Sequence, residues 1–165
     1  MAVKGKVLYD NLGAVATVSD SGSATGFPSS NVIDWHLYTH WTGLSATQNI
    51  VTFDYGSLVD CDCFAVFGHN LPTYSGTVKF QWSADGVTGW TDLIGTVTPA
   101  DTSVIFNSFA SVNKQYYRAV FDTTGGAPTI ACVAFGEFLE MQQGWRTGYQ
   151  PLGILKNVQR KTNMS

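Results

Sequence analysis

Residues 50–90 read IVTFDYGSLVDCDCFAVFGHNLPTYSGTVKFQWSADGVTGW and contain three segments that predict β-strands. Large apolar residues alternate with polar ones in residues 51–55 and 78–83, which predicts strands with one buried face and one wet face. Residues 63–67, CFAVF, are apolar at every position, as in a strand covered on both sides. Turn-forming residues separate the three, and an Asp-Gly pair at 85–86 predicts a tight turn. The stretch predicts a layered β-sheet protein.

The rest of the chain continues the pattern of short apolar segments between turns. Further strands are expected at residues 3–9, 14–18, 91–97, 104–106, 115–121 and 129–139. No segment has convincing helical periodicity, and no internal repeat is present. Strands at roughly ten-residue spacing predict an all-β fold, an antiparallel β-sandwich or jelly roll. A length of 165 residues suits one such domain with an appended arm.

The composition is that of a globular protein with few charges. Apolar residues make up 44% and charged residues 13%, about half the usual charged share. This suits either a surface partly covered by neighbouring subunits or a soluble monomer with a Ser/Thr-rich surface. A net charge of −3 gives no argument for nucleic-acid binding. We expect a homo-oligomer and no nucleic-acid partner.

No apolar run reaches the length of a membrane span, and the N-terminus lacks a signal-peptide core. We therefore expect synthesis in a cytoplasm and no insertion into a membrane. Cys61 and Cys63 are too close for an ordinary disulfide, and the third cysteine, Cys132, lies in an apolar run. We interpret all three as reduced thiols, and a metal site at the Cys-x-Cys pair is disfavoured.

The pattern changes after residue 143, so we expect a β-sandwich domain at 1–143 and an extended arm at 144–165. Residues 142–165 hold four basic and no acidic side chains, whereas all 12 acidic residues lie at or before Glu140. The arm is either a frayed terminus or a segment that lies on another subunit, and we favour the second. Its expected contact residues are Trp145, Arg146, Tyr149, Leu152, Ile154, Leu155, Lys156, Arg160 and Lys161.

Six short motifs occur in an order that resembles the discoidin-like domains, the coagulation-factor-5/8 type C modules within the galactose-binding-like jelly rolls. They are Asn31-x-x-Asp34, Thr39-x-Trp41, Val51-x-Phe53-Asp54-Tyr55-Gly56, Ser83-x-Asp85-Gly86, Tyr116-Tyr117-Arg118 and Gly136-Glu137-Phe138. The resemblance covers residues 29–140. It implies a jelly roll in which Trp41 plugs one end and Asp85-Gly86 lets Trp90 fold back on the sheet. Arg118 is expected to pair with an acid such as Glu137 or to hold loop carbonyls.

The chain also departs from that family. The disulfide that joins the ends of many secreted members has no counterpart, Trp90 follows the Asp-Gly turn one residue late, and Gln115 stands where Arg is frequent. The turn Gly68-His69-Asn70-Leu71 is similar to a feature of bacteriophage virion proteins with this fold. Our first hypothesis is therefore a non-enzymatic structural component of a phage virion, in its tail, baseplate, fibre-linked or decoration subunits, with other virion proteins as partners.

The alternative is a module that binds a host-surface glycan. Sugars are bound by aromatic faces and a few planar polar groups, commonly on loops at one end of a sandwich. The candidate residues are Trp35, His36, Tyr38 and His40 on one loop, with Asn70 and Tyr74 on another. Trp35 and Tyr38 fit a binding role and a core role about equally. Oxygen atoms of Asn31 and Asp34 are candidate ligands of a calcium ion, and no other cofactor is expected.

An enzyme is disfavoured because no catalytic motif surrounds His36, His40 or His69. We expect His69 to hold backbone groups of its turn through hydrogen bonds. A pair of glycosidase carboxylates depends on a separation that the sequence does not reveal, so a glycan hydrolase stays open as a third class.

Overall fold

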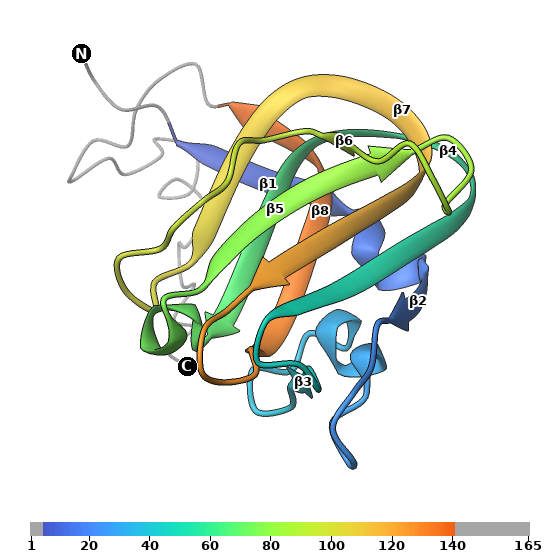
Figure 1. Ribbon diagram of the computed structural model, residues 1–165. Coiled ribbons are helices and arrows are strands. Elements are labelled where there is room, and N and C mark those ends of the chain that lie inside the picture. Colours follow the sequence, from blue (N-terminus) through green and yellow to red (C-terminus); the bar gives the residue numbers. More distant parts are fainter. Residues whose placement is uncertain (1–4, 141–165) are drawn as a thin grey trace, which may run out of the picture. The chain divides into compact units, whose positions relative to one another are not determined.

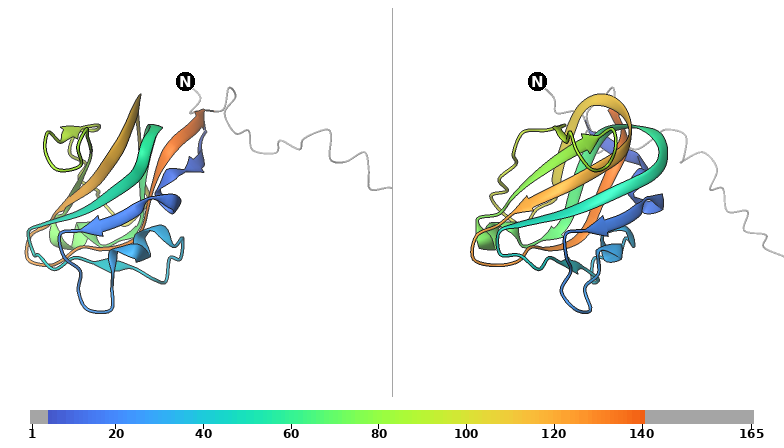
Figure 2. Two further views of the ribbon diagram at one scale, coloured as in Figure 1. Left: turned by 90° about the vertical axis from the view of Figure 1, so that its right-hand side faces the viewer. Right: turned by 45° about the vertical axis from the view of Figure 1, so that its right-hand side comes forward.

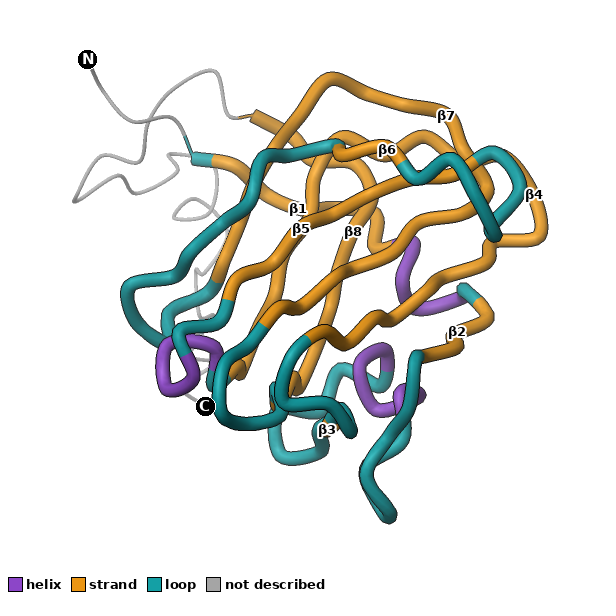
Figure 3. The backbone as a smooth tube through the Cα atoms, viewed as in Figure 1, coloured by secondary structure: helices purple, strands orange, loops and turns teal. Residues whose placement is uncertain are grey.

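The computed structural model describes residues 5–140, which form an antiparallel β-sandwich (Figure 1). The strands are β1 (Lys6–Asn11), β2 (Thr17–Asp20), β3 (Trp41–Thr42), β4 (Gln48–His69), β5 (Thr77–Ser83), β6 (Thr91–Asp92), β7 (Ile105–Asp122) and β8 (Thr129–Glu140). The 3-10 helices are η1 (Leu12–Val15), η2 (Ser29–Ile33) and η3 (Leu71–Tyr74), and the described residues contain no α-helix (Figure 3). The expected all-β fold is confirmed.

Residues Leu8–Leu139 form one compact unit. The predicted boundary between residues 143 and 144, and every contact residue proposed for the arm, lie outside the described part of the chain. Within residues 5–140, no helix is long and apolar enough to cross a membrane.

Two long strands, β4 and β7, run through both layers of the sandwich (Figure 2). The first part of β4, up to Asp54, pairs with β2 and with the last part of β7, and β5 and β6 extend this layer. The last part of β4, from Cys63, pairs with β8 and with the start of β7 in the second layer. The strand order is β1-β8-β4-β7-β5-β6, with β2 beside β4 and β3 beside β8.

The expectation of separate strands at 51–55 and 63–67 is wrong, because both belong to β4. Gly56 adopts a φ of +69° and the pairing with β7 shifts register between Asp54 and Val59, so the strand bends instead of ending. Residues 105–106 and 115–121, from two further predicted strands, likewise belong to the single strand β7. Such a bend lets one strand change layers without a turn.

Two other strand predictions are corrected. Residues 14–18 divide between η1 and β2, because the Asn11 side chain accepts a hydrogen bond from the Gly13 amide and starts a helical turn. Of residues 91–97, only Thr91–Asp92 pair as a strand. The predicted strand at 129–139 is confirmed as β8.

The core between the layers is a cluster of aromatic rings centred on Phe135 of β8. Its ring centroid lies 4.9 Å from that of Phe53, 5.3 Å from Tyr117 and 5.4 Å from Phe80. Phe64 of the second layer stacks on Phe80 of the first at 4.5 Å. All five side chains are fully buried, so aromatic contacts tie the two layers together.

The three cysteines are buried and form no disulfide with one another, and Cys63 and Cys132 are core residues as expected. Burial is the main cause that raises the pKa of Cys63 to about 12 and that of Cys132 to about 11. Their neutral forms are therefore the stable ones at neutral pH.

Replacing Phe135 with Ala is expected to lower the free energy of unfolding by about 3–5 kcal/mol, because the cavity opens between both layers. Chemical denaturation monitored by circular dichroism measures the loss. The matched variant Phe106→Ala removes the same atoms from a ring that is 37% exposed, so its loss should be under about 2 kcal/mol. Equal losses in the two variants would contradict the central role of Phe135.

Candidate functional site

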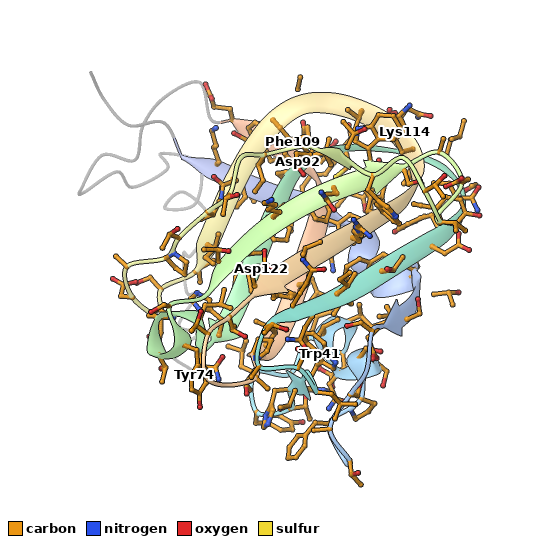
Figure 4. All side chains as sticks on the ribbon, in the orientation of Figure 1. Trp41, Tyr74, Asp92, Phe109, Lys114 and Asp122 are labelled. Atoms are coloured by element: carbon orange, nitrogen blue, oxygen red, sulfur yellow. The ribbon has the colours of Figure 1, made fainter. Side chains whose placement is uncertain are left out.

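The candidate glycan loop, residues 34–40, is held at both ends by buried side chains. Before it, η2 buries Val32, and after it, Trp41 of β3 is completely buried. The Trp41 ring centroid lies 5.8 Å from that of Phe121, and its indole N–H donates to the Ser23 hydroxyl at 3.1 Å. Trp41 therefore plugs one end of the sandwich, as expected, and Figure 4 labels it there. The anchors fix where the loop leaves and rejoins the fold.

The Asp34 carboxylate organises the loop from within. Its Oδ1 accepts a hydrogen bond from the His36 amide at 2.8 Å, and its Oδ2 accepts from the Thr39 hydroxyl at 2.7 Å. Asn31 closes the base by donating its Nδ2 hydrogen to the His40 carbonyl at 2.7 Å. Trp35 sits in the left-handed region with φ +62°, a strained conformation for a bulky residue. The loop thus has a defined backbone that turns its long side chains outward.

Electrostatics support the ionised state of Asp34. Desolvation acts to raise its pKa, but hydrogen bonds from Thr39 and His36 outweigh it, so the pKa of Asp34 lies below its ordinary value. The His36 ring nitrogen Nδ1 lies 3.6 Å from Asp34 Oδ2. A protonated His36 would form an ion pair with this carboxylate.

The loop presents aromatic rings to solvent. Tyr38 is 79% exposed and its ring lies 4.9 Å from that of His36, while Trp35 is 48% exposed and leans on Phe67 at 6.4 Å. The His40 ring stacks on Phe27 at 4.5 Å with an interplanar angle of 17°. The four residues of this loop that the sequence predicted, Trp35, His36, Tyr38 and His40, therefore lie on one short segment, and each ring contacts another aromatic ring.

Phe27 was not among the candidate residues proposed from the sequence. It is 39% exposed and reaches His40 from a different segment. The signal available in the sequence was a large aromatic residue between Gly26 and Pro28, where no strand pattern requires it. We call Phe27, Trp35, His36, Tyr38 and His40 the aromatic loop surface.

Asn70 and Tyr74, the other predicted sugar contacts, are engaged in building loops. Asn70 accepts a hydrogen bond from the Thr129 amide at 2.8 Å and donates to the Ala127 carbonyl at 3.4 Å. The Tyr74 ring lies over Gly126, at the η3 end of the sandwich in Figure 4. Trp41 and His69 both pair with Ile130, on opposite sides of β8, so the two loops start about 10 Å apart. Within residues 5–140, no hydrogen bond, ion pair or ring contact joins residues 34–40 to residues 70–74.

The described residues add no further ligands to Asn31 and Asp34, the residues proposed to bind calcium. Both side chains make hydrogen bonds inside their own loop, and no group of three His, Cys, Asp or Glu in the described residues could hold a metal. Calcium usually takes six to eight oxygen ligands. The calcium site stays a prediction.

His69 makes a backbone hydrogen bond, as predicted, but its partner belongs to a distant segment and not to its own turn. The side chain is buried, and Nε2 lies 2.9 Å from the Ser103 carbonyl oxygen, so this nitrogen carries the proton. It joins the end of β4 to the segment that precedes β7. His69 therefore has a structural role in the described fold.

The sequence matches no protein-family model and no curated protein at a significant level. The fold, in contrast, is similar to many solved structures. Chitosan-binding module 1, derived from a chitosanase/glucanase of Paenibacillus sp. IK-5, has a TM-score of 0.67 and 20% identity, over 78% of this chain and 100% of that one.

Two further structures give similar values. The Clostridium perfringens module CpGH89CBM32-5, in complex with GalNAc-β-1,3-galactose, has a TM-score of 0.66 and 13% identity, over 78% of this chain and 100% of that one. CBM32 of AlyQ, in complex with 4,5-unsaturated mannuronic acid, has a TM-score of 0.60 and 23% identity, over 77% of this chain and 95% of that one. The fold is therefore a galactose-binding-like β-sandwich, shared with carbohydrate-binding modules.

The Asp34 carboxylate predicts how the loop responds to acid. Folding lowers the pKa of Asp34 from its unfolded value near 3.8. The ionised carboxylate therefore stabilises the folded state at a pH above 3.8, and this stabilisation is lost as the pH falls through the lower pKa of the folded state. In an NMR titration, we expect the chemical shift of the His36 amide proton to follow the protonation of Asp34, with a midpoint below pH 3.8. The variant Asp34→Ala should lack this titration. A midpoint at or above 3.8 would contradict the arrangement.

Proposed function

We propose that this protein is a non-catalytic glycan-binding module that uses the aromatic loop surface. The observation that carries the proposal is the exposure of Trp35 and Tyr38 on a loop whose backbone is held by Asp34, Asn31 and the buried Trp41. A rigid loop with exposed large rings has no evident use in stabilising the core. Binding is the function that such a surface supports.

The chemistry of the surface matches a sugar. Flat aromatic rings cover the apolar C–H faces of a pyranose, while the Tyr38 hydroxyl and the imidazoles of His36 and His40 can exchange hydrogen bonds with hydroxyl groups. Rings stiffened by neighbours lose little conformational entropy on binding, and His36–Tyr38 and Phe27–His40 are such pairs. The segment could therefore bind a neutral sugar without rearranging.

The structural neighbours support the same proposal. They are described as a chitosan-binding module and as modules in complex with a GalNAc-galactose disaccharide or an unsaturated mannuronic acid. At 13–23% identity this likeness establishes the fold alone, so the choice of sugar rests on the loop of this chain. Two of the neighbours that the chain covers almost fully are described as chitosan- and pectin-binding modules, whereas the match to a Ruminococcus gnavus GH29 fucosidase covers only 27% of that chain. The neighbours therefore favour binding without hydrolysis.

The phage-virion role, our first hypothesis from the sequence, now ranks second. The structural neighbours compared above are described as a binding module or as complexes with sugars, and the arm on which the hypothesis depends lies outside the described residues. A place in a virion, a homo-oligomeric state and virion partners stay predictions. The two functions are compatible, because an assembly arm and a glycan loop are different parts of one chain.

Changing Trp35→Ala or Tyr38→Ala is expected to weaken binding on a glycan array at least about tenfold, because each removes an exposed ring of the surface. The control is Val87→Ala, which truncates a side chain that is 77% exposed in a different loop and should bind normally. Thermal unfolding of all three should match the parent protein. Unchanged binding in both loop variants would rule out this surface.

The arm is tested by light scattering of the full chain beside a version that ends at Gln143. If the arm drives assembly, the full chain should be a defined oligomer and the shorter chain a monomer. Monomers in both cases would contradict self-assembly through the arm. That result would leave the glycan proposal intact, since the loop lies in the retained part.

A further inference from the structure

A polar row crosses the outer face of the layer that contains β2, β4, β7 and β5. Strand register places Ser19 beside Thr52, Thr52 beside Arg118, and Arg118 beside Gln81. Neighbouring residues at these positions point to the same side of the sheet, opposite to the buried Tyr117. The row spans about 14 Å, and Arg118 is its only cation.

The sequence suggested that Arg118 pairs with an acid such as Glu137, but the structure gives it other partners. Its Nε donates to Gln81 Oε1 at 2.7 Å, and its Cζ lies 4.1 Å from the centroid of the Trp90 ring. Gln81 in turn donates its Nε2 hydrogen to Asp92 Oδ1 at 2.5 Å, which fixes the direction of the amide (Figure 4 labels Asp92). The guanidinium is therefore held at one edge and covered on one face.

The turn before β6 positions the covering ring. Asp85 accepts hydrogen bonds from the amides of Val87 and Thr88, and Gly86 adopts φ +72° against the Tyr116 ring. The Trp90 indole N–H donates to the Val87 carbonyl at 3.2 Å. The predicted Asp-Gly turn thus brings Trp90 back over β7, as expected, and its consequence is an oriented Arg118.

The other edge of the guanidinium is unused. Within residues 5–140, no hydrogen-bond acceptor or ion-pair partner is present for the Nη nitrogens of Arg118. The side chain is half-buried, and this desolvation lowers its pKa while nearby Asp92 acts in the opposite direction. A guanidinium stays protonated under these conditions. A half-desolvated cation with an open pair of donors matches a planar anion that accepts two parallel hydrogen bonds.

We propose that Arg118 binds the carboxylate of an acidic sugar, a uronate, lying along the polar row. Ser19, Thr52 and Gln81 supply groups that can hydrogen-bond to sugar hydroxyls. Asp54 and Asp92 flank the row, so they disfavour a doubly charged phosphate more than a singly charged carboxylate. This site is separate from the aromatic loop surface and does not depend on it.

The competing explanation is that Arg118 only fastens Trp90 to the sheet. The variant Arg118→Lys separates the two possibilities, because it keeps the charge over Trp90 but loses the planar pair of donors. A fastening role predicts a change in unfolding temperature and none in uronate binding by the folded variant. A binding role predicts weaker uronate binding at an unchanged amide spectrum.

The experiment is an NMR titration of the full chain with the trisaccharide of galacturonate, its methyl ester and inorganic phosphate. The acid should shift the Trp90 indole and Gln81 amide signals, whereas the ester and phosphate should not. Arg118→Gln and Arg118→Lys should weaken binding of the acid at least about tenfold. The charge-matched control Lys114→Gln removes the cation that lies 3.9 Å over Trp82 and should bind normally.

Several results would overturn the proposal. They are equal binding of acid and methyl ester, equal binding of phosphate, or unchanged affinity in both Arg118 variants. A failure of galacturonate, glucuronate and mannuronate trisaccharides alike to shift the Trp90 indole would do the same, even if the variants do not fold. Loss of acid binding in Tyr38→Ala would place the acid at the aromatic loop surface instead. Failure of the loop to bind neutral sugars would leave this result unaffected.

Discussion

The contact between the two layers at Phe135 is the interaction on which the remaining structure depends. One ring from β8 meets Phe53, Phe80 and Tyr117 of the opposite layer in tilted and edge contacts, and all are fully buried. Aromatic edges and faces prefer these offset geometries, so the cluster fixes the spacing and the relative rotation of the layers as well as burying area. The loops at the ends of the sandwich inherit their positions from that arrangement.

The second layer is buried on both faces along β8, whereas the layer that contains β5 uses only its inner face for the core, so the outer face of that layer and the loop ends remain available for recognition. On the outer face of the layer that contains β5, alternation along β7 turns Arg118 outward, one residue after the buried Tyr117. At the loop end, the buried Trp41 lets the preceding residues be exposed without loosening the fold. Both proposed sites therefore lie one residue away from a fully buried aromatic anchor, which gives each a rigid support.

How far the candidate site could be predicted differs from residue to residue. Trp35 and Tyr38 were candidates from the sequence, and the structure exposes them on one ordered loop. Asn70 was an equally good candidate, but its amide is used by Thr129 and Ala127, which lie more than fifty residues away in the chain. A polar loop residue can bind a ligand or a distant backbone, and only the tertiary partner decides between these uses. Phe27 was missed for the same reason, since its partner His40 belongs to another segment.

The sequence by itself determined the all-β class, the burial of residues 63–66 and the turn at Asp85, because alternation, apolar runs and turn chemistry are local properties, while the plug at Trp41 came from the resemblance to the discoidin-like domains. Only the tertiary structure decided that β4 and β7 each run through both layers, and that Arg118 meets Gln81 and Trp90 instead of Glu137. The physical reason is that periodicity reports which face of a strand is buried, whereas register and layer assignment depend on contacts between residues far apart in the chain.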